Sequence, residues 1–65
     1  MTPMIYRLHI RDDGPRYHWC VTGHWSEWVG QIHQSQVAVL AQGTAANYLD
    51  ALEGARSMYP QAVLL

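Results

Sequence analysis

The sequence predicts a small α+β domain in which a three-stranded antiparallel sheet packs against one C-terminal helix. Three features support this fold. Apolar and polar residues alternate on both sides of an Asp-Gly turn, a run with β-branched residues lies mid-chain, and apolar residues recur at helical spacing near the C-terminus. The length of 65 residues leaves room for one domain, residues 1–65. A hairpin followed by two helices is the alternative fold.

The N-terminal hairpin is predicted from two alternating segments. Their apolar positions are Met4, Tyr6, Leu8, Ile10, Tyr17, Trp19 and Val21. Gly14, between the segments, favours a turn because glycine adopts a positive φ without steric cost. If Asp12 opposes Pro15, apolar residues meet apolar residues on one face, and polar residues meet on the other. The polar pairs in this register are Arg11 with Arg16, His9 with His18, and Arg7 with Cys20.

The C-terminal helix is expected over residues 45–58. Gly43-Thr44 precedes it as a break and an N-cap, since a threonine hydroxyl accepts a backbone N–H bond from the first turn. The apolar stripe consists of Ala45, Tyr48, Leu49, Leu52, Ala55 and Met58. Pro60 ends the helix, and Gly54 within it indicates a close approach by a neighbouring group. The apolar tail 62–65 is expected to form a short edge strand or a docking segment.

The middle of the chain admits two assignments. Residues 36–41 (QVAVLA) contain two valines and are followed by a glycine, which favours a third strand. The segment 24–34 before them is then a structured loop or an additional short strand. The competing assignment is a helix from Ser26 to Gly43, whose apolar stripe is interrupted at Ser35-Gln36.

Composition restricts the class of protein. Apolar residues make up 49% of the chain and charged residues 14%, which excludes a disordered tail. A net charge of −1 argues against a general binder of nucleic acids or membrane surfaces. We also expect no membrane span, because no apolar run approaches about 18 residues. The expectation is a cytoplasmic domain that self-associates as a homodimer, because so small a core supplies little stability by itself.

The polar face of the predicted hairpin is the main candidate interface. It gathers three of the four arginines with two histidines, namely Arg7, His9, Arg11, Arg16 and His18. One interpretation is an ordinary solvated face, neutralised by nearby carboxylates. The other is a docking patch for the acidic surface of another protein or for a nucleic-acid backbone.

Cys20 lies on the same predicted face as His9 and His18, and these three are the ligand types that zinc prefers. The flanking arginines would repel a cation, and no fourth ligand is evident, so we predict no metal and no cofactor. A thiol nucleophile at Cys20 would need a pocket and an orienting shell, for which the sequence offers no motif. The chain is therefore predicted not to be an enzyme.

Two tryptophans form a second candidate interface. Trp25 and Trp28 lie in the irregular segment GHWSEWVG, and a small sheet has little room to bury both. Tryptophan combines an apolar body with a polar N–H and is enriched at binding hot spots. We expect at least one of them to be an exposed anchor for a partner or a second copy.

The order of elements resembles the HicB-type antitoxin domain. The matching segments are IYRLHIRDDG at 5–14, VLAQGT at 39–44 and LDALEGAR at 49–56. The resemblance implies a β-β-β-α core, closed by a strand at 61–65, that dimerises and binds a partner protein. The chain departs from the family in having HWSEWVG where a Pro/Gly-centred loop is usual, and we do not expect the resemblance to extend to the DNA-binding module of full antitoxins.

These observations predict a non-catalytic protein-binding module that masks or neutralises a partner, either antitoxin-like or a small phage-encoded inhibitor of a bacterial defence or regulatory protein. Such a small domain has surface for one interface and little else. The alternatives are a nucleic-acid-binding protein that uses the Arg/His face and a structural subunit of a larger assembly.

Overall fold

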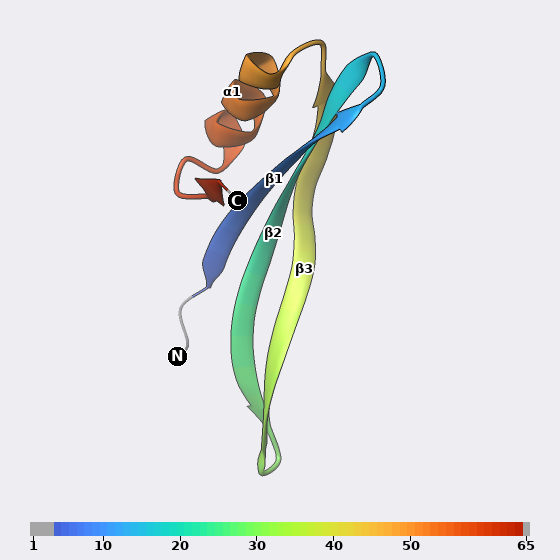
Figure 1. Cartoon of the computed structure of the whole chain (residues 1–65). Helices are drawn as coiled ribbons and strands as arrows, with labels where there is room; N and C mark the ends of the chain where they lie inside the picture. The colour runs from blue at the N-terminus through green and yellow to red at the C-terminus, as the bar shows by residue number, and fades with distance from the viewer. Residues whose placement is uncertain (1–3, 65) are drawn as a thin grey trace.

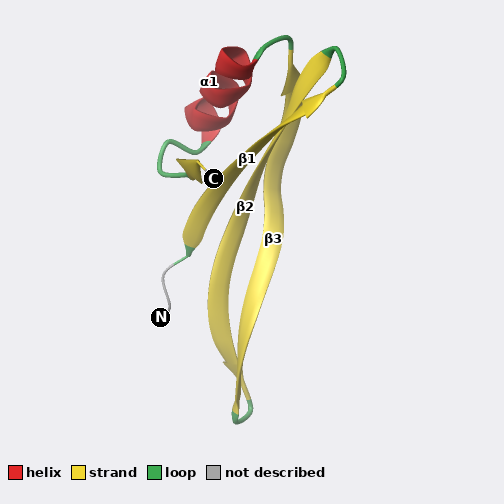
Figure 2. Ribbon diagram, in the orientation of Figure 1, coloured by secondary structure: helices red, strands yellow, loops and turns green. Residues whose placement is uncertain are grey.

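The computed structural model describes residues 4–64, which form one four-stranded sheet and one helix (Figures 1 and 2). The elements are β1 (Ile5–Asp13), β2 (Arg16–Val29), β3 (Ile32–Ala45), α1 (Tyr48–Met58) and β4 (Val63–Leu64). The strand order is β3-β2-β1-β4, with antiparallel pairing except between β1 and β4, which are parallel. The predicted α+β class is confirmed, with one more strand than the predicted three.

The register of the first hairpin differs from the prediction by two residues. Asp13 pairs with Arg16, so the turn consists of Gly14 and Pro15. Pro15 has no N–H to donate to a ladder, and Gly14 takes a φ of +72°, as the first position of a tight hairpin turn requires. Opposite charges now face each other at the turn, whereas the predicted register opposed Arg11 to Arg16.

The third strand predicted at 36–41 is confirmed as part of β3. For the segment 24–34 the structured loop and the alternative helix from Ser26 are wrong, and the segment is strand, as the other alternative proposed. β2 continues to Val29, turns at Gly30 with a φ of +63°, and returns as β3 from Ile32. The two segments form strands because they pair with each other along their whole length, and this pairing outweighs the loop-like local composition of 24–34. The pairing shifts between Val21 and Thr22, which leaves Leu40 as the extra residue of a β-bulge.

The helix begins later than predicted, and its cap is a different residue. Thr44 lies within β3, and the N-cap is Asn47, whose Oδ1 accepts the backbone N–H of Asp50 at 2.8 Å. The Asn47 side chain also donates to the Asp50 carboxylate at 3.1 Å. An acidic residue in the first turn further suits the positive end of the helix dipole.

Replacing Asn47 with alanine is expected to lower the free energy of unfolding by about 1 kcal/mol, because the cap hydrogen bond is lost. Thr44→Ala is the matched control, since Thr44 is exposed in β3, and we expect a change within about 0.5 kcal/mol. Urea unfolding followed by circular dichroism measures both. A larger loss for Thr44→Ala than for Asn47→Ala would contradict this assignment of the cap.

The core lies between α1 and one face of the sheet, which we call the inner face. Its buried residues are Leu8, Trp19, Val21, Ala51, Ala55 and Ala62. Two aromatic pairs flank it, Tyr6 with Tyr59 and Tyr17 with Tyr48, with ring centroids 5.8 Å and 6.1 Å apart. The apolar face predicted for the hairpin is thus the face that α1 covers. Leu8 is buried there, Tyr6 and Ile10 pack beside it, and Met4 is 38% exposed.

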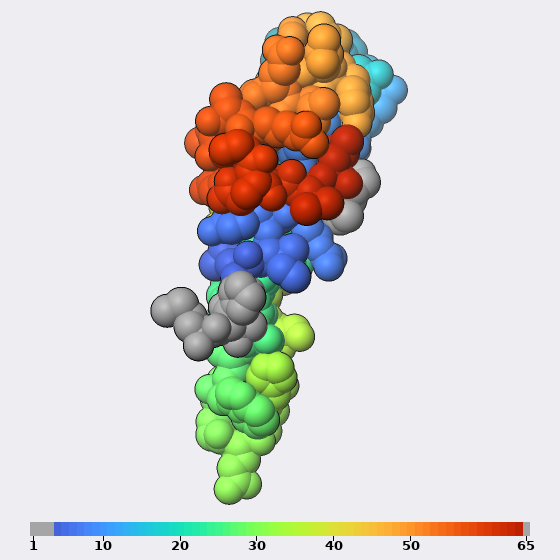
Figure 3. Space-filling view, turned by 90° about the vertical axis from the view of Figure 1, so that its left-hand side faces the viewer, coloured from blue at the N-terminus to red at the C-terminus, as the bar shows by residue number. Residues whose placement is uncertain are grey.

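The chain folds into an elongated molecule of 47 × 21 × 15 Å. α1 covers the end of the sheet near the β1–β2 turn, while β2 and β3 extend beyond the first residue of β1 (Figure 1). We call this projecting hairpin, residues 25–36, the arm. In Figure 3, which views the molecule from the side of α1, the arm stands clear of the helix and of β1. β4, the predicted tail strand, pairs with β1 at Arg7 and Leu8.

Candidate protein-binding face

The sheet face opposite α1, which we call the outer face, is formed by alternate residues of β1 and β2. Because side chains of a strand alternate between faces, odd-numbered residues of β1 and even-numbered residues of β2 project from it. They include all five predicted hairpin residues, namely Arg7, His9, Arg11, Arg16 and His18. His18 is half-buried and the other four are exposed. The prediction that these residues share a face is confirmed.

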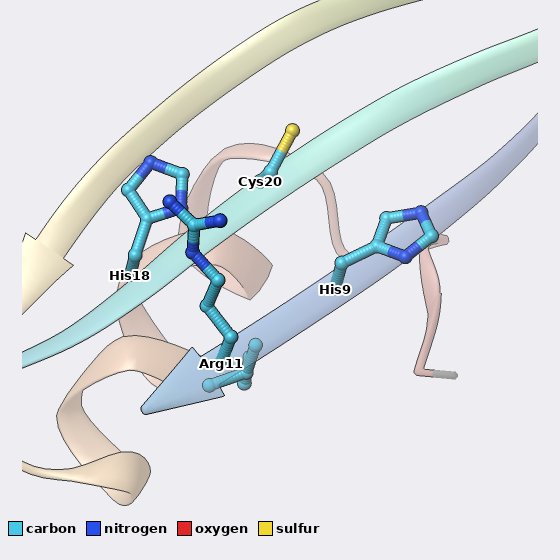
Figure 4. Close-up of a pocket in the computed structure, with 5 residues that line it drawn as sticks. His9, Arg11, His18 and Cys20 are labelled. Carbon is cyan, nitrogen blue, oxygen red and sulfur yellow. The ribbon is translucent and has the colours of Figure 1, made fainter. Parts of the chain in front are cut away.

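Their neighbours across the strands differ from the prediction. Arg11 pairs with His18, and His9 pairs with Cys20. Figure 4 shows these four side chains projecting from the same side of the two strands, with α1 behind the sheet. With Ile10 they line a shallow depression of about 310 Å³. The guanidinium and imidazole groups provide N–H donors around this depression, as recognition of carboxylates requires.

A hydrogen-bonded chain of three side chains continues the polar surface. Thr22 Oγ1 lies 3.2 Å from His9 Nε2 and 2.8 Å from His24 Nε2. A hydroxyl group has one hydrogen to donate and two lone pairs to accept, so it joins the two rings and holds their orientation. His24 was missed as a site residue because the sequence assigned 24–34 to a loop, and Thr22 was missed because the predicted register opposed it to Ile5 and not to Arg7. The signal for them was present, since the alternation of β2 continues without interruption from His18 to His24.

Apolar side chains lie next to the basic ones on the outer face. Ile5 and Val37 pair with His24 from either side, and Val39 pairs with Thr22. These three apolar residues are 52%, 62% and 59% exposed. A second depression of about 290 Å³ lies at this end of the sheet, lined by Ile5, Arg7, His24, Trp25, Ser26, Ser35 and Gln36. The outer face is therefore a mixture of cationic donors and exposed aliphatic groups.

The two predicted tryptophan anchors differ in exposure. Trp28 is 70% exposed on the arm, where its ring lies against His33 with centroids 4.9 Å apart. Trp25 is half-buried and lines the second depression. The structure places both in β2 and not in an irregular loop, and Trp28 lies far along the arm from the arginines of the outer face.

The residues that resemble zinc ligands do not form a site. Among residues 4–64, no three His, Cys, Asp or Glu side chains are close enough to hold a metal ion. Cys20 is a free, half-buried thiol opposite His9. Within the same described residues, no helix is long and apolar enough to cross a membrane.

Comparisons with protein-family models, curated proteins and solved structures found no match to this chain.

Proposed function

We propose that this chain is a non-catalytic protein-binding module that docks its outer face on an acidic, partly apolar surface of another protein. Charge distribution is the observation that carries the proposal. Three of the four arginines project from the outer face, whereas Arg56 lies in α1. Of the carboxylates in β1 and β2, only that of Asp13 lies at an outer-face position, and it is paired with Arg16 at the turn. A face with a net positive charge favours a partner of the opposite sign and increases the association rate.

The exposed aliphatic residues favour a protein partner over a nucleic acid. Ile5, Val37 and Val39 would lose water contact against a protein surface. Because each is already almost half covered, it would contribute about half of the roughly 1.5–3 kcal/mol of a side chain buried from full exposure. Against a phosphate backbone the same residues contribute nothing. Bases would need aromatic platforms, and the exposed Trp28 lies on the arm, away from the arginine cluster.

Docking on this face would mask the partner's own surface, which is the action expected of an antitoxin-like neutraliser or a phage-encoded inhibitor. The outer face supports masking more than catalysis, because its depressions are open and shallow. The proposal therefore assigns binding to Arg7, Arg11, His9 and their neighbours, and assigns no chemistry to Cys20.

Reversing two arginines is expected to abolish capture of the partner. Tagged chain is used to capture proteins from host lysate, and the wild type is compared with Arg7→Glu/Arg11→Glu. These two arginines oppose Thr22 and His18, so the reversal introduces no like-charge pair, unlike Arg16→Glu, which would face Asp13. We expect one stoichiometric partner whose affinity for the double variant is at least about 30-fold weaker, as loss of a hot spot implies.

Arg56→Glu is the control for a general charge effect, because this arginine lies at the end of α1 on the other side of the sheet. It should retain the partner. Capture of nuclease-sensitive material with a steep loss at higher salt would replace the proposal with nucleic-acid binding. Retention of the partner by the double variant, or capture of no other macromolecule, would overturn it.

A further inference from the structure

The edge of the sheet formed by β3 lacks the short length, charges and prolines that usually keep edge strands apart, and the β-bulge at Leu40 is the one protective feature that it carries. β3 is 14 residues long and, among the described residues, pairs only with β2. Its sequence IHQSQVAVLAQGTA contains no Arg, Lys, Asp, Glu or Pro. The N–H and C=O groups on its free side are therefore available to another strand, with no charge or proline to prevent pairing.

The opposite edge of the sheet is protected in the ordinary way. β4 is only two residues long, and beyond it β1 carries Arg11, Asp12 and Asp13 at its end. Short strands and charged side chains are the usual protection of an edge. The contrast singles out β3 as the edge that accepts a further strand.

The arm also lacks support. Two-stranded hairpins are at best marginally stable in water, and the arm extends past both β1 and α1. It nevertheless exposes Val29, Ile32 and Trp28 at 51%, 63% and 70%. A strand added along β3 would convert the arm into a three-stranded sheet and supply the main-chain hydrogen bonds that its free side lacks.

We propose that the strand that pairs with β3 is β3 of a second copy, in antiparallel orientation about a two-fold axis at Ala38. This register sets Val37 of each copy against Val39 of the other, so four exposed valines meet on the outer face. A neutral strand faces a neutral strand, with no charge to desolvate. β3 carries no charge that would attract the acidic partner proposed for the outer face. A second copy of the chain, whose β3 is equally uncharged, is therefore the favoured occupant of this edge.

The dimer and the proposed function can be tested separately, although the Val37 and Val39 side chains belong to both surfaces. A two-fold axis perpendicular to the sheet places both outer faces on the same side of one continuous sheet, and both copies of α1 on the other. Arg7 and Arg11 of β1 therefore remain exposed to solvent in each copy. Pairing along β3 can therefore fail while partner binding succeeds, and the reverse also holds.

The test is the mass in solution, measured by light scattering after size-exclusion chromatography, with reductant present so that Cys20 cannot link two chains. The wild type is expected at twice the chain mass of 7.4 kDa. Val37→Lys/Val39→Lys is expected to be a monomer, because it places charges along the β3 edge. Val63→Lys should remain a dimer, since Val63 is 57% exposed on the other edge of the sheet.

Hydrogen exchange of the wild type gives a second readout if the lysine variant fails to fold. Those amides of residues 36–40 that point away from β2 should be protected at high protein concentration and should lose protection on dilution, while amides of β1 change less. A wild type that is monomeric at every concentration, a dimeric lysine variant, or exchange in β3 that does not depend on concentration would each overturn the proposal.

Discussion

Truncation of Leu8 to alanine is expected to leave a large part of the protein unfolded. Leu8 is fully buried in the central strands of the sheet, under α1. Loss of a buried leucine side chain lowers stability by about 2–5 kcal/mol. A core of this size supplies only about 3–5 kcal/mol in total. Urea unfolding, followed by tryptophan fluorescence at a fixed protein concentration, should show a shifted midpoint and a substantial unfolded fraction without denaturant.

The matched control is Leu49→Ala, which removes the same atoms from a residue that is 60% exposed on α1. We expect a change within about 0.5 kcal/mol. The sequence assigned Leu49 to the apolar stripe of the helix, so this control also tests where the buried face of α1 lies. Equal losses for Leu8→Ala and Leu49→Ala would contradict the described core.

The second large effect concerns two glycines that face the same tryptophan. A Cβ atom added at Gly43 would lie 2.7–2.9 Å from Cζ2, Cε2 and Nε1 of Trp19, which is closer than such atoms approach each other. Trp19 is held between the sheet and α1, so it has little room to move. Gly43→Ala is therefore expected to lower the free energy of unfolding by about 1–3 kcal/mol through overpacking.

Gly54→Ala is expected to have the opposite sign. A Cβ atom at Gly54 would lie 3.6 Å from Trp19 Nε1, an ordinary contact, and alanine is the better helix former by about 0.5–1 kcal/mol. Thermal and urea unfolding of both variants measure the pair. The predicted close approach at Gly54 is thus an ordinary contact, and the tight one occurs at Gly43. Stabilisation by Gly43→Ala would refute this packing of the indole.

These stability effects bear on the binding proposals because the core and the outer face are two sides of the same strands. Leu8 lies between Arg7 and His9 in β1, so the inner side chains hold the strand that presents the outer ones. Variants of Arg7, Arg11 and Arg16 should leave the unfolding midpoint nearly unchanged, since these side chains are exposed. A loss of binding with retained stability is the result that separates an interface residue from a structural one.

The candidate face could be predicted from the sequence because it depends on a period of two residues. Arg7, His9 and Arg11 share a face in any register, since alternation is a local property of an extended strand. The predicted register was displaced by two residues, and such a displacement keeps every side chain on its face. The face was therefore right, although the cross-strand neighbours were wrong.

Tertiary structure decided what local pattern could not. Pairing of β2 with β3 along the whole arm overrode the loop-like composition of 24–34, because strand formation there depends on a partner distant in sequence. The same pairing carried Thr44 into β3 and moved the N-cap to Asn47. The pairing of β1 with β2 brought His9 to Thr22, which also bonds His24, and the strand order left the uncharged β3 at the edge. Alternation along the chain thus determined which residues lie on each face, and contacts between distant segments determined which of them meet.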